Sequence, residues 1–288
     1  MSRETDTHPQ GWDGKVSMET TGTDGGRALR SPVSTAWILV GLVLGGCADD
    51  ERPFVAPFTQ PPFDGTIFID PDIITEADPT TFVGLVYSGQ GSRQMFDRRV
   101  NGWVTLDPFL FNATYSDGLT IEVQVNPEFA SVTSAEAEAV FYADAVGRLP
   151  TALRLDVETM WIHRGVELYG GGNRNILIHT GQTAEYTGLG ILEETLVHEA
   201  AHTSLDGRYA SSPGWLAAQS SDPTFISTYA RDFPAREDIA ESFVPYLAIR
   251  YRADRISSTL RTRIENAIPN RIAFFDGLGL DMVPIVQP

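Results

Sequence analysis

The chain has 288 residues, of which 42% are apolar, and this length accommodates one sizeable domain. Its formal charge of −17 argues against a nucleic-acid partner, because binding to phosphates requires a basic surface. The single cysteine, Cys47, excludes a disulfide within the chain and a metal site built from several thiolates.

The first 47 residues have the pattern of an export signal. Arg27 and Arg30 precede an apolar run at residues 36–44, and a short apolar run after a positive segment is typical of a secretory signal peptide. The letters LGGC at 44–47 resemble the bacterial lipobox, whose cysteine is lipidated and becomes the N-terminus after cleavage. We therefore interpret residues 1–47 as a signal peptide with lipobox and Cys47 as the lipidation site. The alternatives are an uncleaved N-terminal anchor and a buried free cysteine.

This interpretation implies an exported protein of the bacterial cell envelope, which is held on a membrane through its lipid. Residues 48–63 contain four prolines and no apolar periodicity, so they predict a flexible tether between the lipid and a domain at 64–288. The part of that domain at 64–130 is β-rich, with Asp-Pro, Gly and Asn-Gly between strand-like runs. The expected strands lie at residues 66–70, 81–89, 102–115 and 119–126.

An amphipathic helix is predicted at 134–149, with Ala137, Val140, Phe141 and Ala145 on its apolar side. Strand-like runs follow at 154–163 and 175–180. Residues 175–179 form either an interior strand or a sheet edge that pairs with an extended peptide. His163 and His179 are expected to be structural, with His179 as the one that could line a cleft. From Gly190 the pattern is mostly helical to the end of the chain, so we predict an α+β fold with a small mixed β-sheet.

The sequence H-E-x-x-H is formed by His198, Glu199 and His202 inside the first of these predicted helices, which Gly207 is expected to end. Two histidines four residues apart lie on one face of a helix, with Cβ atoms about 5–6 Å apart, so both imidazoles can reach one metal ion. Glu199 lies between them and can accept a proton from bound water. This pattern predicts a catalytic Zn²⁺ site, which needs a third protein ligand and an open position.

The third ligand has to come from further along the chain. The pattern H-E-x-x-H-x-x-G-x-x-H is absent, because Leu205 and Arg208 occupy the required glycine and histidine positions. Asp206 lies one turn after the second histidine and could support a ligand or cap the helix. Glu237 and Glu241 are four residues apart on a later predicted helix, so one can bind a metal while the other holds an imidazole.

The letters YA at 229–230 and EDIAESF at 237–243 resemble the helix that completes the zinc site in gluzincins related to the bacterial lethal-factor toxin. The resemblance covers the helices at about 190–252. It implies a zincin-like fold for residues 64–288 and makes Glu237 the third zinc ligand. It also implies that Glu241 lies behind a ligand and that Tyr229 faces the reacting carbonyl.

The resulting hypothesis is zinc-dependent peptide-bond hydrolysis by a lipid-anchored, exported metalloprotease that acts on peptide or protein substrates. In it, His198, His202 and Glu237 hold Zn²⁺, Glu199 is the general base, and Tyr229 donates a hydrogen bond to the oxyanion. A competing hypothesis is a non-catalytic surface lipoprotein that uses a zincin fold as a binding module. A metal-dependent hydrolase of non-peptide substrates would share the same ligands.

Overall fold

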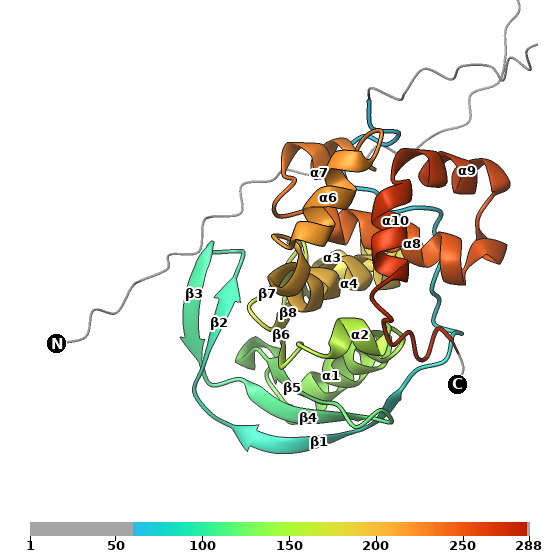
Figure 1. Cartoon of the computed structure of the whole chain (residues 1–288). Helices are drawn as coiled ribbons and strands as arrows, with labels where there is room; N and C mark the ends of the chain where they lie inside the picture. Colours follow the sequence, from blue (N-terminus) through green and yellow to red (C-terminus); the bar gives the residue numbers. More distant parts are fainter. Residues whose placement is uncertain (1–59, 287–288) are drawn as a thin grey trace, which may run out of the picture. The chain divides into compact units, whose positions relative to one another are not determined.

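The computed structural model describes residues 60–286 (Figure 1). The predicted signal peptide, the lipobox with Cys47 and most of the predicted tether lie outside these residues. Among the helices of residues 60–286, none combines the length and the apolar character needed to cross a membrane. This part of the chain has a mixed α+β fold, as predicted, with a six-stranded mixed sheet and helices that follow it in the chain.

The sheet has the strand order β1-β4-β5-β6-β8-β7, and a separate hairpin consists of β2 and β3. Its first three strands are antiparallel, β5, β6 and β8 are parallel, and β7 pairs antiparallel with β8 at the edge. The strands are β1 (Phe82–Gln90), β2 (Arg93–Asp97), β3 (Gly102–Leu106), β4 (Phe109–Tyr115), β5 (Thr120–Val125), β6 (Thr159–His163), β7 (Gly170–Gly172) and β8 (Asn175–His179).

Three of the six predicted strand-like runs are confirmed, and three differ. The segment 66–70 is not a strand, because the backbone N–H of Ile67 donates to the side chain of Glu241 at 2.9 Å. The run at 102–115 is two strands, separated at Asp107 and Pro108. The run at 154–163 contributes only β6, since Thr151–Arg154 forms the short helix α2.

Helix α1 (Val132–Gly147) confirms the predicted helix, but of the four residues predicted on its apolar side only Ala145 is buried. Its buried residues include Ala135, Ala139 and Tyr142, whereas Val140 and Phe141 are 40% and 46% exposed. Small alanines allow the helix backbone to lie close to β1, β4 and β5, which it contacts. The buried face therefore follows the steric fit to the sheet and not the largest apolar side chains.

The remaining helices come mainly after the sheet in the chain. They are α3 (Thr180–Gly188), α4 (Leu192–Ala201), α5 (Gly207–Tyr209), α6 (Pro213–Ser221), α7 (Thr228–Asp232), α8 (Asp238–Tyr251), α9 (Ser258–Ala267) and α10 (Pro269–Asp276). A π-helical turn, His202–Asp206, joins α4 to α5, so the helical path continues through Gly207 and the predicted stop there is wrong.

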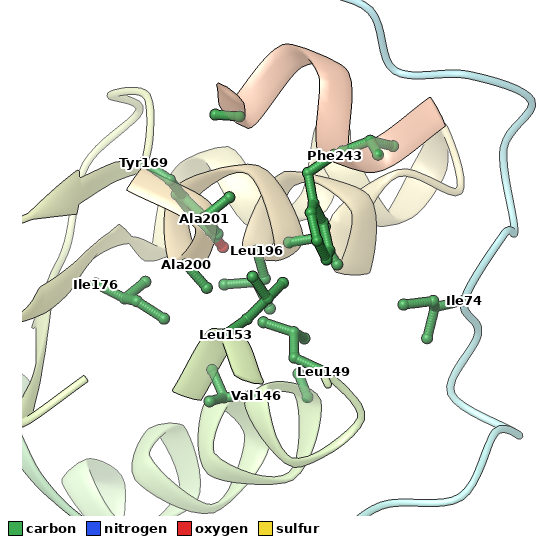
Figure 2. Packing of buried hydrophobic residues seen from close by; sticks show 14 of the residues in the cluster. Ile74, Val146, Leu149, Leu153, Tyr169, Ile176, Leu196, Ala200, Ala201 and Phe243 are labelled. Carbon is green, nitrogen blue, oxygen red and sulfur yellow. The ribbon is translucent and has the colours of Figure 1, made fainter. Parts of the chain in front are cut away.

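Helix α4 lies at the centre of the molecule, and every one of its residues is buried. It contacts β7, β8 and α1 on one side and α8 on the other. Figure 2 shows Leu196, Ala200 and Ala201 of this helix among side chains from α1, α2, β8 and α8. A helix in this position holds its side chains rigidly, which suits a site that demands fixed geometry.

The β2–β3 hairpin covers the opposite face of the sheet. Successive residues of a strand point to opposite faces. Accordingly, Met160 and Ile162 of β6 face the helices, whereas Trp161 packs with Leu177 and with Met95 of the hairpin. Both faces at the centre of the sheet are therefore covered, and the helical side carries the histidine helix.

Candidate metal centre

Strand β7 and helix α4 approach each other so closely that only glycine fits between them. A Cβ atom on Gly171 would lie 2.0 Å from the carbonyl oxygen of Glu199. Contact with the H-E-x-x-H helix thus explains the glycine at position 171, in the middle of β7. The sequence allowed residues 175–179 to be either an edge strand or an interior strand. They form β8, an interior strand between β6 and β7, so β7 is the edge strand beside the helix.

The π-helical turn is tied to the same strands through one hydroxyl. The Oγ1 of Thr203 accepts from the backbone N–H of Gly172 at 2.8 Å and lies 2.8 Å from the carbonyl oxygen of Asn175. It also lies 3.1 Å from the carbonyl oxygen of Glu199. Together, these three contacts fix the end of α4 and the adjoining His202 relative to the sheet.

Three side-chain atoms converge beside α4: the Nε2 atoms of His198 and His202 and the Oε2 of Glu237. The two nitrogens are 3.1 Å apart, and Glu237 Oε2 is 3.1 Å from His202 Nε2 and 3.6 Å from His198 Nε2. Ligands at about 2.0–2.1 Å from a tetrahedral metal are about 3.3 Å apart. The three distances match one face of such a tetrahedron, so this buried group could hold a metal ion.

Each imidazole has a carboxylate near its other nitrogen. His202 Nδ1 is 2.7 Å from Asp206 Oδ2, and His198 Nδ1 is 3.6 Å from Glu241 Oε1. The Asp206 contact is a hydrogen bond, whereas the Glu241 contact is longer than one and leaves both of its atoms without a hydrogen-bond partner in residues 60–286. A proton on Nδ1, next to a carboxylate, leaves the lone pair of Nε2 to the common centre in each ring. Two lone pairs and a carboxylate oxygen at this separation repel one another unless a cation lies between them. Asp206 and Glu241 thus lie where the sequence predictions put them, behind the candidate ligands.

Glu237 directly precedes helix α8, and its second oxygen is held from outside the cluster. Its Oε1 accepts hydrogen bonds from the Tyr229 hydroxyl at 3.1 Å and from Arg236 Nε at 2.8 Å. Oε2 remains directed at the histidines. The guanidinium of Arg236 also stacks on Phe233, 4.7 Å from the ring centroid. Its contact with Glu237 was not predicted, because an arginine next to a glutamate in the sequence is too common to indicate a site.

The electrostatic field of the site favours a cation. Burial disfavours charge on His202, but hydrogen bonds to Asp206 and Glu237 outweigh it and raise the pKa of His202 well above its usual value. Burial also opposes charge on His198, and contact with Glu237 again leaves its pKa raised. For Glu237, burial acts to raise the pKa, but the two imidazoles lower it below its usual range. A buried site that favours protonated imidazoles also favours a metal cation.

Glu199 and Tyr229 flank the cluster without belonging to it. Glu199 is 8% exposed, and its Oε2 is buried with no hydrogen-bond partner in residues 60–286. Such an oxygen is available to a water or substrate proton. Tyr229 is half-buried, and burial together with the charge of Glu237 raises its pKa to about 12, so its hydroxyl stays protonated and can donate.

The two other described histidines are structural, as expected. His163 and His179 are both fully buried at the ends of adjacent strands, with ring centroids 5.3 Å apart. His163 Nδ1 contacts the Asn126 amide at 2.9 Å, and His179 Nδ1 contacts the Arg164 carbonyl at 3.0 Å. Burial lowers the pKa of His163 to about 4. Since His179 has no exposed surface, it does not line a cleft.

The site therefore has a defined composition: a buried group of two imidazoles and one carboxylate, a carboxylate behind each imidazole, and Glu199, next to His198 in the chain, whose Oε2 has no hydrogen-bond partner in the described residues. The chain matches no protein-family model, no curated protein and no solved structure in comparisons with all three. What the site does is accordingly inferred from its own geometry and chemistry.

Proposed function

We propose that this protein is a zinc-dependent peptidase with a gluzincin-type active site, in which His198, His202 and Glu237 hold Zn²⁺. The observation that carries the proposal is the convergence of these three side-chain atoms at 3.1–3.6 Å, next to Glu199, whose Oε2 has no hydrogen-bond partner among residues 60–286. Two histidines and one glutamate are a donor set of catalytic zinc in proteolytic enzymes. Three protein ligands leave the fourth position for water or substrate.

Zinc bound at this position would polarise a carbonyl and lower the pKa of water to about 7. Glu199 then accepts the proton of the attacking water through its unpartnered Oε2 and delivers it to the leaving amine. Asp206 and Glu241 keep the proton of each imidazole on Nδ1, which leaves Nε2 free to bind the metal.

Tyr229 has the role of hydrogen-bond donor to the carbonyl oxygen that becomes negative during attack. Its hydroxyl lies 3.1 Å from Glu237 Oε1, at the border of the ligand cluster. For the phenol to turn to a substrate, another group has to keep holding Glu237, and Arg236 does so at 2.8 Å. A donor to such an oxyanion is worth roughly 3 kcal/mol in the transition state.

The fold around the site is compatible with a zincin arrangement. A mixed sheet has a short antiparallel edge strand, β7, and the histidine helix lies directly beside it. An extended peptide that pairs with a sheet edge at this point would lie along α4. We therefore propose peptide as the substrate class, in preference to small non-peptide esters or amides.

Attachment to the cell envelope through a lipid on Cys47 completes the proposal. It rests on the sequence of residues 1–47 alone. Mass spectrometry of the mature N-terminus tests it: a diacylated or triacylated Cys47 is expected, whereas an unmodified Cys47 within a longer chain would contradict it.

The proposed activity is tested with an unfolded protein substrate such as casein. Purified protein should carry one zinc per chain and cleave the substrate, lose cleavage with a chelator, and regain it when zinc is restored. Zinc without cleavage of any peptide library would favour the binding-module hypothesis, and zinc with hydrolysis of only non-peptide esters would favour the non-peptide hydrolase.

A further inference from the structure

The carboxylate behind His198 is itself fixed by two donors from distant parts of the chain. Oε2 of Glu241 accepts from the hydroxyl of Ser227 at 2.6 Å and from the backbone N–H of Ile67 at 2.9 Å. Ser227 and Glu241 are fully buried, and Ile67 is 3% exposed. With both donors on Oε2, the plane of the carboxylate is set and Oε1 is left facing His198 Nδ1, 3.6 Å away.

Ile67 belongs to a segment that we name the N-terminal strap, residues 63–69. The next strap residue, Phe68, is half-buried with its ring centroid 6.3 Å from that of His198. One strap residue thus holds the carboxylate behind the imidazole, and its neighbour packs on the imidazole itself. The strap therefore reaches His198 in two ways, through Glu241 at Nδ1 and through the ring of Phe68.

The strap also pairs with the chain just before Tyr229. Phe63 and Ser227 form a parallel β-bridge, and the N–H of Thr228 donates to the Phe63 carbonyl at 3.0 Å. The N–H of Gly65 donates to the Thr228 hydroxyl at 2.8 Å. Ser227 therefore links three elements. Its backbone pairs with the strap, and its side chain donates to Glu241. The same hydroxyl caps α7, where it accepts from the Ala230 N–H at 3.0 Å.

We infer that the N-terminal strap is a working part of the metal centre, and that Ser227 and the N–H of Ile67 are positioning groups that orient His198 through Glu241. This inference rests on the proposed metal centre. A buried carboxylate without its donors would rotate or take up a proton, and the Nδ1 of His198 would lose a fixed acceptor. The consequence is weaker metal binding with an intact fold.

The first test compares zinc affinities measured by competition with a chromogenic chelator. Ser227→Ala removes the donor to Glu241 and should weaken zinc binding roughly tenfold, the lower end of the range for groups that hold a metal ligand. Ser227→Thr retains a hydroxyl and should stay within about twofold of the wild type.

The matched control is Ser257→Ala. Ser257 also caps a helix, accepting from Leu260 N–H at 3.1 Å, and has no contact with the site. It should lose a similar helix cap yet keep the wild-type zinc affinity. Ile67→Pro, which removes the N–H, should weaken zinc binding like Ser227→Ala, whereas Ile67→Val should not.

The outcomes separate this inference from the proposed peptidase. Wild-type affinity in Ser227→Ala, or an equal loss in Ser257→Ala, would overturn the positioning role. A wild-type protein that binds zinc but hydrolyses no peptide would refute the peptidase, and the zinc affinities would still decide the role of the strap. A wild-type protein that binds no zinc would refute both.

Discussion

At the scale of single residues, the site is defined by which atom of each side chain is already engaged. Asp206 and Glu241 lie against the Nδ1 atoms of the histidines, and Tyr229 and Arg236 engage Oε1 of Glu237. What remains are two imidazole nitrogens and one carboxylate oxygen that face one another. Spacing predicts that the two histidines meet, and the resemblance adds Glu237; the contacts of their other atoms leave these three side chains facing one another as a group that could hold a metal ion.

Glu199→Gln tests the general base. The amide keeps the shape of the side chain but cannot accept the proton of water, so turnover should fall about 10²–10⁴-fold while one equivalent of zinc is retained. Steady-state cleavage of a fluorogenic peptide and metal analysis of the same sample measure both quantities. Cleavage at the wild-type rate would remove Glu199 from the mechanism.

Tyr229→Phe tests the oxyanion donor. Loss of the hydroxyl should lower kcat about 10²-fold with little change in KM, because the hydrogen bond forms only in the transition state. Zinc should be retained, since Arg236 still holds Glu237 Oε1 at 2.8 Å. If KM rose and kcat stayed constant, Tyr229 would be a substrate-binding residue instead.

At the scale of elements, helix α4 has a buried acid in its first turn. Burial raises the pKa of Glu194 from about 4.5 to about 8, although its Oε1 accepts from the N–H of Ile74 at 3.0 Å. Folding therefore takes up a proton between pH 4.5 and 8. The contribution of Glu194 to stability is complete below pH 4.5 and falls as pH rises through that window, by up to about 1.4 kcal/mol per unit.

Glu194→Gln removes this titration while an amide oxygen can still accept from Ile74. The variant should be more stable than the wild type at pH 8, with the difference vanishing toward pH 4.5. Urea denaturation at fixed zinc concentration measures it, and Glu158→Gln is the control, because that side chain is 60% exposed. An equal pH dependence in wild type and Glu194→Gln would contradict the protonation of Glu194 in the fold.

Gly171→Ala tests the contact between β7 and α4. The added Cβ would lie 2.0 Å from the Glu199 carbonyl, so strand or helix has to move, at a cost of about 1–3 kcal/mol or more. Activity should fall with stability, because Glu199 and His198 are on that helix and His202 follows directly at its end. Gly84→Ala, in β1 with nothing within 4 Å of the new Cβ, is the control and should change stability by less than about 0.5 kcal/mol.

At the scale of the whole molecule, the order of elements and the H-E-x-x-H helix were predictable from periodicity. The buried face of α1 was not, because Ala135 and Ala139 were selected by fit to the sheet over Val140 and Phe141. Part of the strap was mistaken for a strand, because Ile67 and Ile69 are buried in alternation as strand residues are, while the N–H of Ile67 donates to the side chain of Glu241 on α8.

Contacts between residues far apart in the sequence limit how much of the site could be predicted. Glu241 and Ile67 are separated by 174 residues, and no local pattern predicts that a backbone N–H holds that carboxylate. The same holds for Ser227, which reads locally as a helix cap and nothing more. Even residues of the predicted tether belong to this assembly: Phe63 pairs with Ser227, and Arg263 binds the Pro62 carbonyl.

Anomalous diffraction at the zinc absorption edge tests most directly whether these distant segments build the proposed metal centre. Crystals of the zinc-loaded protein should show one ion at about 2.0–2.2 Å from His198 Nε2, His202 Nε2 and Glu237 Oε2. An ion bound without Glu237, or no ion between the two histidines, would contradict the account.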